Sequence, residues 1–476
     1  MATTGEAPAE TREGACVPHP NRNGIDSRNG SRITHARITK PMNIIQITPG
    51  AGKMFCGNCF RDNALVAALR KMGHSAWLVP LYLPLTLEEE DQSAGTPIFF
   101  SGVNVYLEQK SSFFRNAPDW LHDLLASKPL LQWAAGKTAK TRAEDLGELT
   151  ISMLRGEEGH QARELEELIA WLKTQPAPDV ICLSNALLVG LARHLRRVVG
   201  APVVCLLQGE DSFLDALPSP HKENAWTTLA ERAAEVDLFI APSQYFGDLM
   251  GNRLRLAAGR VRVIYNGINL DGYVPAPASP AVPVLGYFAR MCREKGLDAL
   301  VDAFILLKQR NRVKDLKVRV GGGCGPADEK FVATLRSRLE ARGFLQDAEF
   351  HPNLDRAGKQ AFLKSLSVFS VPARYGEAFG LYLVEAWASG VPVVQPDHAA
   401  FPELIKATGA GVLCAPGSAE ALADSIEQLL ADPGKLRTLG EAGRAAAVKK
   451  FSVENLARET VEVFQKLCTK PSEPIL

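Results

Sequence analysis

Two glutamates, Glu377 and Glu385, carry the clearest chemistry in the sequence, because they lie on either side of a glycine-rich helix start. Residues 381–388 contain no helix breaker and run into Gly390, which predicts a short helix ended by a left-handed glycine. Glu385 then lies on this helix, and Glu377 lies in the loop before it. One loop and one helical turn therefore carry both carboxylates.

Backbone amides at the start of this helix add a second chemical group. The free amides expected there are those around Phe379, Gly380 and Leu381. Such amides bind phosphate oxygens, and carboxylates accept hydrogen bonds from vicinal hydroxyls. The loop and the helix together can hold the phosphate, the ribose and the hexose of a sugar nucleotide.

This stretch resembles the E-x7-E signature of the retaining family 4 glycosyltransferases, enzymes that move a sugar from a nucleotide sugar to an acceptor. The resemblance covers residues 42–466, because further motifs follow in the family's order. It implies an α/β protein of the GT-B fold, with two Rossmann-like domains whose parallel sheets face an interdomain cleft. It also implies that Glu377 contacts sugar hydroxyls and that Glu385 contacts the ribose. Taken alone, the motif has another interpretation, in which Glu377 caps the helix and Glu385 is solvated.

A second motif is similar to the family's arginine-to-lysine phosphate clamp. An apolar strand pattern that contains Gly286 ends at Arg290, and Lys295 follows shortly after it. Arginine offers a planar fork to one phosphate and lysine a mobile point charge to the other, so together they offset the charge of a leaving diphosphate. The alternative is that Glu294 neutralises one of these cations in a surface ion pair.

Two later strand patterns end in residues that are expected near the nucleotide. These candidates for donor binding are Gly322, His351 and Asn353. The glycine-rich run at 321–325 also invites a dinucleotide-binding interpretation. It lacks a third glycine at the right spacing, and Pro326 intervenes before the helix, so an NAD-dependent dehydrogenase is not expected.

The pattern over residues 43–72 is strand, glycine-rich loop and helix, and the next apolar segment predicts a second strand. This alternation indicates a parallel sheet with crossover helices, so the N-terminal half is expected to be Rossmann-like. In the family this loop, with Gly50 and Gly52, lies at the cleft near donor phosphate or acceptor. A P-loop is not expected, because Met54 stands where that motif needs Ser or Thr.

Two further buried strands, at 179–185 and 202–207, end in polar residues, and ligands of open α/β sheets bind beyond such ends. Gln208 stands where many family members have His, and an amide bonds a hydroxyl but exchanges no proton near neutral pH. Glu210 and Asp211 either orient the acceptor hydroxyl or cap the next helix.

Cys56 and Cys59 form a C-x-x-C in the first glycine-rich loop. No second pair stands at metal-ligand spacing, which favours small reduced residues over a zinc or redox site. Because cations and amides can stabilise a leaving diphosphate, we expect no metal and no cofactor. The substrate is then a nucleotide sugar, and the choice among UDP, GDP and ADP stays open.

Length and composition set the outer limits. A chain of 476 residues is expected to form two domains of roughly 200 residues each. The 54 basic and 53 acidic side chains give a net charge of +1, so nucleic acid is not an expected partner. Nine scattered cysteines favour a reducing cytosol over a secreted disulfide framework. Residues 1–40 contain no apolar run long enough for a signal peptide, and no run elsewhere reaches the roughly 18 residues of a spanning helix, so neither is expected.

The expected organisation has five parts. These are a disordered tail at 1–40, an acceptor domain at 41–274 with a helical insertion at 108–175, a proline-rich linker at 275–283, a nucleotide-sugar domain at 284–450, and a helix at 451–476 that crosses back to the first domain before a short tail. The insertion interleaves aromatics with cations. It either covers a core or makes a peripheral contact with the cytoplasmic membrane or a bulky acceptor.

The predicted function is retaining transfer of a sugar to a hydroxyl of a carbohydrate, lipid or small-molecule acceptor. Two alternatives remain. One is a noncatalytic sugar-nucleotide binder, which the departure at Gln208 keeps open. The other is a GT-B enzyme of another reaction, such as a nucleotide-sugar epimerase or a phosphorylase, although no recognisable context for a pyridoxal lysine is present. The oligomeric state is not predicted.

Overall fold

The computed structural model describes residues 40–50, 57–85, 87–100, 143–278 and 280–469. The chain divides into Met1–Lys40 and a second unit, Pro41–Leu476, which holds all the elements below. The tail expected at 1–40 lies outside the described residues apart from Lys40. Most of the insertion expected at 108–175 does so too, because its description begins at residue 143.

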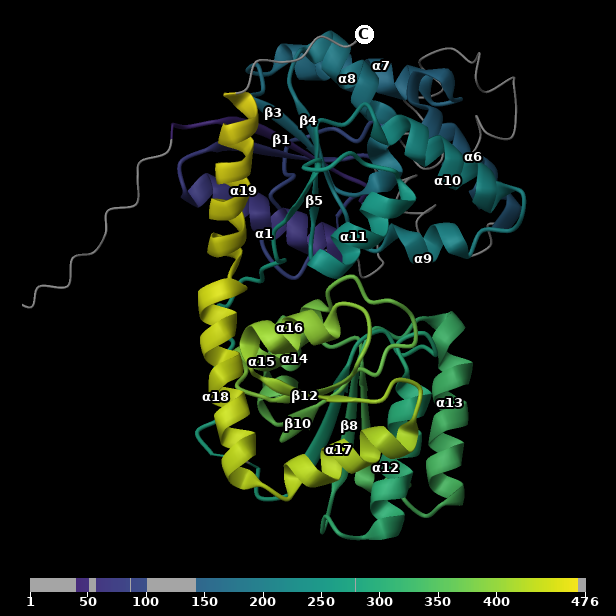
Figure 1. The fold of residues 1–476 in the computed structure, drawn as a ribbon, viewed down its shortest axis with the longest axis vertical. Helices are drawn as coiled ribbons and strands as arrows, with labels where there is room; N and C mark the ends of the chain where they lie inside the picture. The colour runs from purple at the N-terminus through teal and green to yellow at the C-terminus, as the bar shows by residue number, and fades with distance from the viewer. Residues whose placement is uncertain (1–39, 51–56, 86, 101–142, 279, 470–476) are drawn as a thin grey trace, which may run out of the picture. The chain divides into compact units, whose positions relative to one another are not determined.

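Within the described residues, the strands form two six-stranded parallel sheets (Figure 1). The first sheet has the order β2-β1-β3-β4-β5-β6 and consists of β1 (Asn43–Thr48), β2 (Ser75–Pro80), β3 (Val180–Leu183), β4 (Val203–Leu206), β5 (Leu238–Ala241) and β6 (Val261–Val263). The second has the order β12-β11-β10-β7-β8-β9 and consists of β7 (Val284–Phe288), β8 (Lys317–Gly322), β9 (Ala348–Pro352), β10 (Val368–Phe369), β11 (Val393–Pro396) and β12 (Gly411–Cys414). The α/β class and the pair of parallel sheets are therefore as predicted.

Helices cover both faces of the first sheet, as the apolar strands require, because successive side chains of a strand point to opposite faces. Ile44 of β1 packs with α1 (Gly57–Lys71) and α19 (Val453–Cys468). Ile45 and Ile47 pack in the core on the other face. The elements of that other side are α6 (Ala143–Arg155), η2 (Gly156–Glu158), α7 (Ala162–Thr174), η3 (Ala186–Leu191), α8 (Ala192–Val199), α9 (Glu210–Asp215), α10 (His221–Ala233) and α11 (Gln244–Arg253).

The second sheet has its own core, which includes the fully buried Trp387. Its helices are α12 (Leu297–Arg310), α13 (Pro326–Ala341), η4 (Leu345–Asp347), α14 (Arg356–Lys364), α15 (Leu381–Ala388), α16 (Phe401–Thr408), α17 (Ala419–Leu430) and α18 (Pro433–Lys450). We call the elements around the first sheet, with α19, the first lobe. Those around the second sheet, with α18, are the second lobe.

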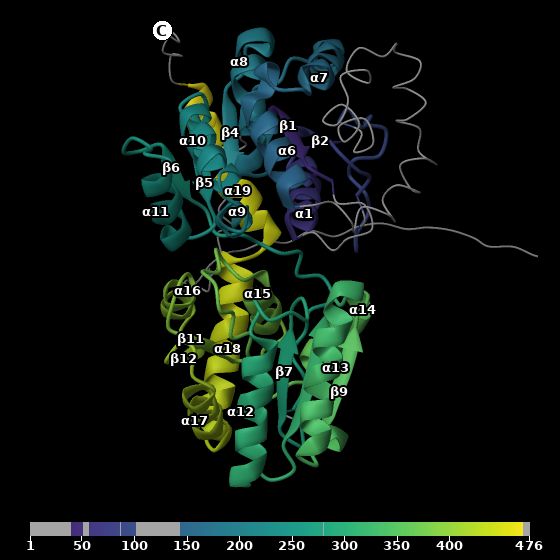
Figure 2. The same cartoon turned by 90° about the vertical axis from the view of Figure 1, so that its right-hand side faces the viewer.

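The chain passes between the lobes twice, and the two passes lie side by side. The amide of Ile268 donates to the carbonyl of Phe451, and the amide of Val453 donates to the carbonyl of Ile268, both at 2.9 Å. Gly267 is packed so closely on Ser452 that a Cβ would collide with its backbone. Figure 2 shows α18 on the second lobe leading directly into α19 on the first.

Several elements match their predicted bounds, and some differ for physical reasons. The helix expected at 381–388 is α15, and Gly390 behind it has φ +74°. The strand β6 ends at Val263, and the chain then turns toward the second lobe. In α7 the apolar residues Leu165, Leu168, Ile169 and Leu172 are buried.

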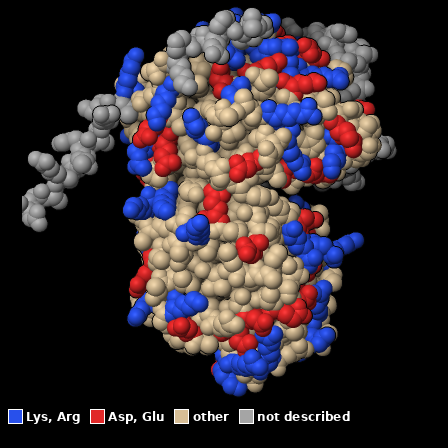
Figure 3. Space-filling model, viewed as in Figure 1, with Lys and Arg blue, Asp and Glu red and all other residues tan. Residues whose placement is uncertain are grey.

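Charged side chains of both signs are interspersed over the face shown in Figure 3, in keeping with the balanced composition. None of the helices that the structure describes is both long and apolar enough to pass through a bilayer.

Candidate active site

Glu377 lies in the loop before α15 and is held through one oxygen. Its Oε2 accepts from Lys295 Nζ at 2.6 Å and from the Tyr382 hydroxyl at 2.8 Å, and the Tyr375 hydroxyl lies 3.5 Å away. Burial lowers the pKa of Lys295, but the charges of Glu377 and Tyr375 and the hydrogen bonds to them together raise it above its usual range. Burial and the Glu377 charge also raise the pKa of Tyr375 to about 12. Near neutral pH, Glu377 therefore faces a cation and two neutral hydroxyl donors.

Glu385, on α15, has the same kind of support from different residues. Its Oε1 accepts from the Tyr273 hydroxyl at 3.0 Å and pairs with Lys359 Nζ at 2.8 Å. Lys359 is buried and also pairs with Glu88 of the first lobe at 2.8 Å. Burial lowers the pKa of Lys359, whereas Glu385 and Glu88 raise it, with a net rise. A lysine and a tyrosine thus hold one oxygen of each glutamate of the motif.

The second oxygen of each carboxylate has a different environment from the first. Within the described part of the chain, no hydrogen bond or ion pair is formed by Glu377 Oε1 or by Glu385 Oε2. An ionised carboxylate whose orientation is fixed through one oxygen presents the other as a directed acceptor for hydroxyl donors. The arrangement suits two separate hydroxyl-bearing groups, one at each glutamate.

Arg290 follows β7 and points its guanidinium at α13. Its Nε and Nη2 donate to the two carboxylate oxygens of Asp328 at 3.1 and 3.0 Å. This pairing raises the pKa of Arg290, while its side chain remains 63% exposed. The alternative ion pair of Arg290 or Lys295 with Glu294 is not among the ion pairs of the described residues, where Asp328 and Glu377 are the partners. Lys295 therefore lies beside the loop before α15, whereas the guanidinium of Arg290 lies beside the first turn of α13.

The start of α15 combines a left-handed glycine with a buried aromatic residue. Gly380 caps the helix with φ +88°, and Phe379 packs on Tyr265 and Phe451 with ring centroids 6.2 and 5.9 Å apart. Leu381 is the first residue of the helix. The amide of Leu383 donates to the carbonyl of Gly380 at 3.0 Å, and the other first-turn amides lie at the end of the helix that suits an anion.

The other predicted donor residues lie at the carboxyl end of the second sheet or within it. Gly322 has φ +121°, and a Cβ there would collide with the Ala289 carbonyl beside Arg290. Asn353 clamps the loop after β8, accepting from the amide of Cys324 and donating to its carbonyl, both at 3.0 Å. The contacts of the last two candidates are explained by packing and by one neighbouring carboxylate.

These two are His351 and Gly286. The ring of His351 lies 3.1 Å from Glu349 and packs edge-on against Phe362. Gly286 lies inside β7, where a Cβ would collide with Leu366, so packing alone accounts for a glycine there.

In the first lobe, Gly50 and the residues after β4 occupy the predicted sheet edge. Gly50 has φ +72°, and a Cβ on it would collide with the Leu83 carbonyl. Gln208 Oε1 accepts from Asn266 at 3.2 Å. Gln208 also lines an internal cavity of about 10 Å³, the size of a single water.

The carboxylates after Gln208 differ in environment. Glu210 is buried and accepts from the amides of Ala186 at 2.7 Å and Gln208 at 2.8 Å, so it ties two loops together. Burial raises the pKa of Glu210 and that of Asp211. The Oδ1 atom of Asp211 is buried and has no hydrogen-bond partner among the described residues. Gly209 beside them has φ +95°, and a Cβ on it would lie 3.7 Å from Ala378, next to Glu377.

Gly52 and Cys56 lie outside the described residues. Cys59 is buried in α1. Across the described ranges, no group of three or more His, Cys, Asp or Glu is placed to hold a metal ion. The expectation that no metal or cofactor is needed remains a prediction.

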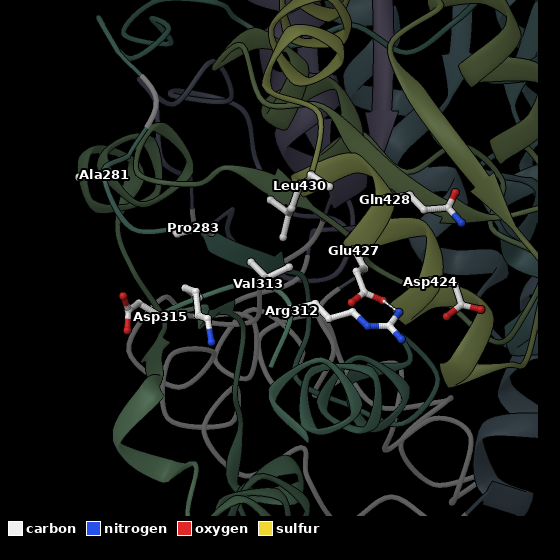
Figure 4. Close-up of a pocket in the computed structure, with 11 residues that line it drawn as sticks. Ala281, Pro283, Arg312, Val313, Asp315, Asp424, Glu427, Gln428 and Leu430 are labelled. Carbon is white, nitrogen blue, oxygen red and sulfur yellow. Dashed lines mark ion pairs between the residues drawn. The ribbon is translucent and has the colours of Figure 1, made fainter. Parts of the chain in front are cut away.

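Two hollows help to locate the site. One, of about 80 Å³ next to Glu385, is lined from both lobes, with Glu88, Lys359 and Tyr273 in its wall. A larger one of about 660 Å³ is shown in Figure 4. Its residues Pro283 and Asp315 precede β7 and β8, so it lies at the amino ends of the strands. Ligands of open parallel sheets bind at the carboxyl ends, so we place the site at the first hollow.

Comparison with known proteins now identifies the family. The model for "Glycosyl transferases group 1" matches residues 277–446, and the model for "Glycosyltransferase Family 4" matches residues 142–271. An alpha-maltose-1-phosphate synthase of Mycobacterium tuberculosis is 30% identical over 276 residues, which are 53% of this chain and 69% of that protein. The chain belongs to the family 4, or group 1, glycosyltransferases.

Other relatives of this family 4 glycosyltransferase match over a smaller share. A phosphatidyl-myo-inositol mannosyltransferase of Mycobacterium leprae is 32% identical over 215 residues, 44% of this chain and 54% of that protein. The chain thus spans about half the length of several of the curated relatives it matches.

Solved structures of the same architecture cover nearly the whole chain. A sucrose-phosphate synthase from Thermosynechococcus elongatus has a TM-score of 0.66 at 19% identity, covering 90% of this chain and 99% of that one. Anabaena HepE in complex with UDP-glucose has a TM-score of 0.61 at 17% identity, covering 89% of this chain and 100% of that one. At these identities the likeness shows the fold, and it agrees with the predicted GT-B architecture.

Sequence reasoning missed the partners that hold the motif of this glycosyltransferase. They are Asp328, Tyr375, Tyr382, Tyr273 and Lys359. Tyr382 carried a usable signal, because it stands on α15 between the two glutamates. Tyr375 stands two residues before Glu377 in the same loop. Asp328, Tyr273 and Lys359 come from separate segments and look in the sequence like ordinary surface or linker residues.

Proposed function

We propose that this protein transfers a sugar from a nucleotide sugar to an acceptor hydroxyl with retention at the anomeric carbon. The matched support of the two glutamates carries the proposal. Glu377 and Glu385 are each fixed through one oxygen by a lysine and a tyrosine, with the other oxygen left for hydroxyl donors. Neutralising the charge of each glutamate would need only the lysine. The added tyrosine hydroxyl also fixes the orientation of the carboxylate.

In this proposal the donor lies along the start of α15. Glu385 Oε2 accepts from the ribose hydroxyls and Glu377 Oε1 from a hydroxyl of the sugar. The diphosphate lies between them, against the first-turn amides of α15, Arg290 and Lys295. Support for a nucleotide-sugar donor comes from the UDP-glucose complex of the similar HepE structure. The names of the relatives support sugar transfer in general but leave the base, the sugar and the acceptor open.

The proposed step breaks the bond between the anomeric carbon and the diphosphate oxygen, and the bonding electrons leave with the diphosphate. The acceptor oxygen bonds to the anomeric carbon on the same face, and its proton passes to an oxygen of the departing phosphate. Arg290 and Lys295 stabilise the charge that develops on the leaving group. We propose that the transfer proceeds without a metal ion. Glu377 holds the sugar while the bond changes.

The acceptor is proposed to approach from the first lobe. Asp211 follows Gly209, whose backbone lies next to Ala378 in the donor loop. The Asp211 carboxylate and the backbone around Gly50 are the groups we propose for orienting the acceptor hydroxyl. Glu210 is occupied by two backbone amides, so we assign it the role of fixing this edge of the sheet.

The test is nucleotide release from a panel of UDP-, GDP- and ADP-sugars in EDTA, with wild type, Glu377→Ala and Arg290→Ala. Arg293→Ala is the matched control, because Arg293 is an exposed cation in the same loop. We expect slow hydrolysis of one donor by wild type and the control, and a loss of at least about a hundredfold in the other two variants.

Three other results would contradict parts of the proposal. Binding of a nucleotide without release, with and without candidate acceptors, would favour the noncatalytic binder. Release that requires added Mg²⁺ would remove the metal-independent mechanism. Equal losses in Arg290→Ala and Arg293→Ala would show that the assigned clamp is only a general surface charge.

A further inference from the structure

The loop that carries Glu377 belongs to the second lobe, yet the first lobe holds its backbone. The hydroxyl of Ser243 donates to the carbonyl of Ala378 at 2.7 Å, and both residues are buried. The same hydroxyl oxygen accepts from the amide of Phe246 at 3.1 Å, which makes Ser243 the N-cap of α11. One side chain therefore caps a helix of the first lobe and fixes the residue next to Glu377.

A carboxylate of the second lobe completes the capping of the same helix. Glu403 on α16 accepts from the amides of Gln244 at 2.9 Å and Tyr245 at 3.1 Å. A carboxylate at a helix N-terminus satisfies free amides and interacts favourably with the helix dipole. The amides of the first three residues of α11 are thus bound by Ser243 and by a residue of the opposite lobe.

The donor loop and α16 are connected to each other, so these contacts act together. The amide of Ala400, which precedes α16, donates to the carbonyl of Glu377 at 3.3 Å. A Cβ on Gly376 would collide with the Tyr245 hydroxyl, which shows how closely α11 approaches the loop. Separation of the lobes would remove the Ser243 bond from Ala378 and, at the same time, both amides from Glu403.

We infer that Ser243 and Glu403 are positioning residues that hold the Glu377 loop in its working place only while the two lobes are together. The inference rests on the proposed function, because it assigns the loop to the donor sugar. Arg290 and Glu385 belong to the second lobe and have their printed partners outside this loop, so nucleotide binding depends on the contact less than sugar transfer does. Sugar transfer does depend on it, because Glu377 must be set against both the donor and the first lobe.

The decisive experiment substitutes a residue of the first lobe and measures hydrogen–deuterium exchange in the second lobe. Hydrogen–deuterium exchange of residues 376–380 is compared in the full-length wild type, Ser243→Ala and Ser418→Ala. Ser418 is the matched control, because it caps α17 through the amide of Ala421 at 3.0 Å wholly inside the second lobe. We expect exchange of 376–380 to rise about tenfold in Ser243→Ala and to stay unchanged in Ser418→Ala, since a buried carbonyl loses its donor only in the first.

Kinetics with the donor found in the nucleotide-release panel separate positioning from folding. We expect kcat to fall about tenfold in Ser243→Ala, with the Kd for the nucleoside diphosphate within twofold of wild type and Ser243→Thr restoring kcat. Should Ser243→Ala not fold, Glu403→Gln tests the same contact. It keeps one acceptor oxygen, so we expect exchange of 376–380 and kcat to change about fivefold.

Unchanged exchange of 376–380 in both variants would overturn the inference, and so would kcat values equal to those of Ser418→Ala. A nucleotide affinity that falls as much as kcat would also overturn it, because the loop would then act through general collapse of the site. The exchange measurement needs no substrate. A wild type that releases nucleotide from no donor would therefore count against the proposed function, while exchange still decides whether Ser243 holds the loop.

Discussion

Replacement of Lys359 by methionine is the most informative single change, because this buried cation joins a donor-site glutamate to the other lobe. Lys359 lies 2.8 Å from both Glu385 and Glu88, with its side chain only 9% exposed. At that distance each pair is worth about 6 kcal/mol for an effective dielectric constant of about 20, before desolvation is subtracted. Measured losses for breaking a buried pair by removing one partner are about 3–5 kcal/mol, which is the magnitude we expect at pH 8.

The loss should depend on pH in a defined direction. Without the ammonium group, two partly buried carboxylates face each other, and the pKa of at least one rises above its value in the unfolded chain. The folded variant then binds more protons than the unfolded chain, so its stability falls as pH rises through that window. The deficit relative to wild type should therefore be smaller at pH 5 than at pH 8. Glu88→Gln in the Lys359→Met background should recover part of it, since one stranded charge is removed.

Urea unfolding at pH 5 and pH 8 measures this deficit, and Lys364→Met is the control. Lys364 lies at the end of the same helix and has no ion pair within the residues that the structure describes. A deficit below about 1 kcal/mol, the size of an exposed ion pair, would refute the reasoning. An equal deficit at both pH values would do so as well, because it would mean that lost packing and not stranded charge causes the effect.

Three further changes test other parts of the structure. Ala399 has φ +56°, so Ala399→Gly should raise stability by about 1 kcal/mol, seen as a higher urea midpoint; a lower midpoint would contradict the strain. Burial raises the pKa of Glu210 above 4.5, so stability from this group is full below that pH and is lost as pH rises through the folded pKa. Glu210→Gln should therefore flatten the fall of the thermal midpoint from pH 4.5 upward, and an unchanged slope would count against a buried titrating carboxyl. Gly322→Ala forces a collision with the Ala289 carbonyl beside Arg290, so it should lower the free energy of unfolding by about 2 kcal/mol or more. It should also weaken binding of UDP or GDP, measured by calorimetry. Full nucleotide affinity would show that this glycine does not position Arg290.

The fold could be predicted from sequence because its signals are local. Apolar runs alternate with helical patterns, and each run occupies one short continuous segment, as in Asn43–Thr48 and Val284–Phe288. The ligand-facing residues could be found for the same reason. Glu377, Glu385 and Lys295 belong to compact motifs whose spacing follows from a single loop or helix.

The supporting residues outside the Glu377 loop and α15 could not be predicted, because their roles arise only when distant segments meet. Asp328 lies 38 residues from Arg290 in the chain, and Tyr273 lies 112 residues from Glu385. Tyr273 falls just before a proline-rich stretch that looked like a simple linker. Ser243 has an ordinary N-cap pattern, and nothing in its neighbourhood indicates the second bond to the opposite lobe.

The placement of α19 has a consequence for how the chain folds during synthesis. The second lobe is built from one uninterrupted segment up to Lys450, whereas the first lobe needs Val453–Cys468 to finish its core. Until that last helix leaves the ribosome, apolar side chains of this core such as Leu65 and Ile44 lack the part of their cover that α19 provides. The N-terminal half is thus made first and completed last, and contacts between such distant segments are slow to form. A chain that stops before α19 would expose this face and be prone to aggregate.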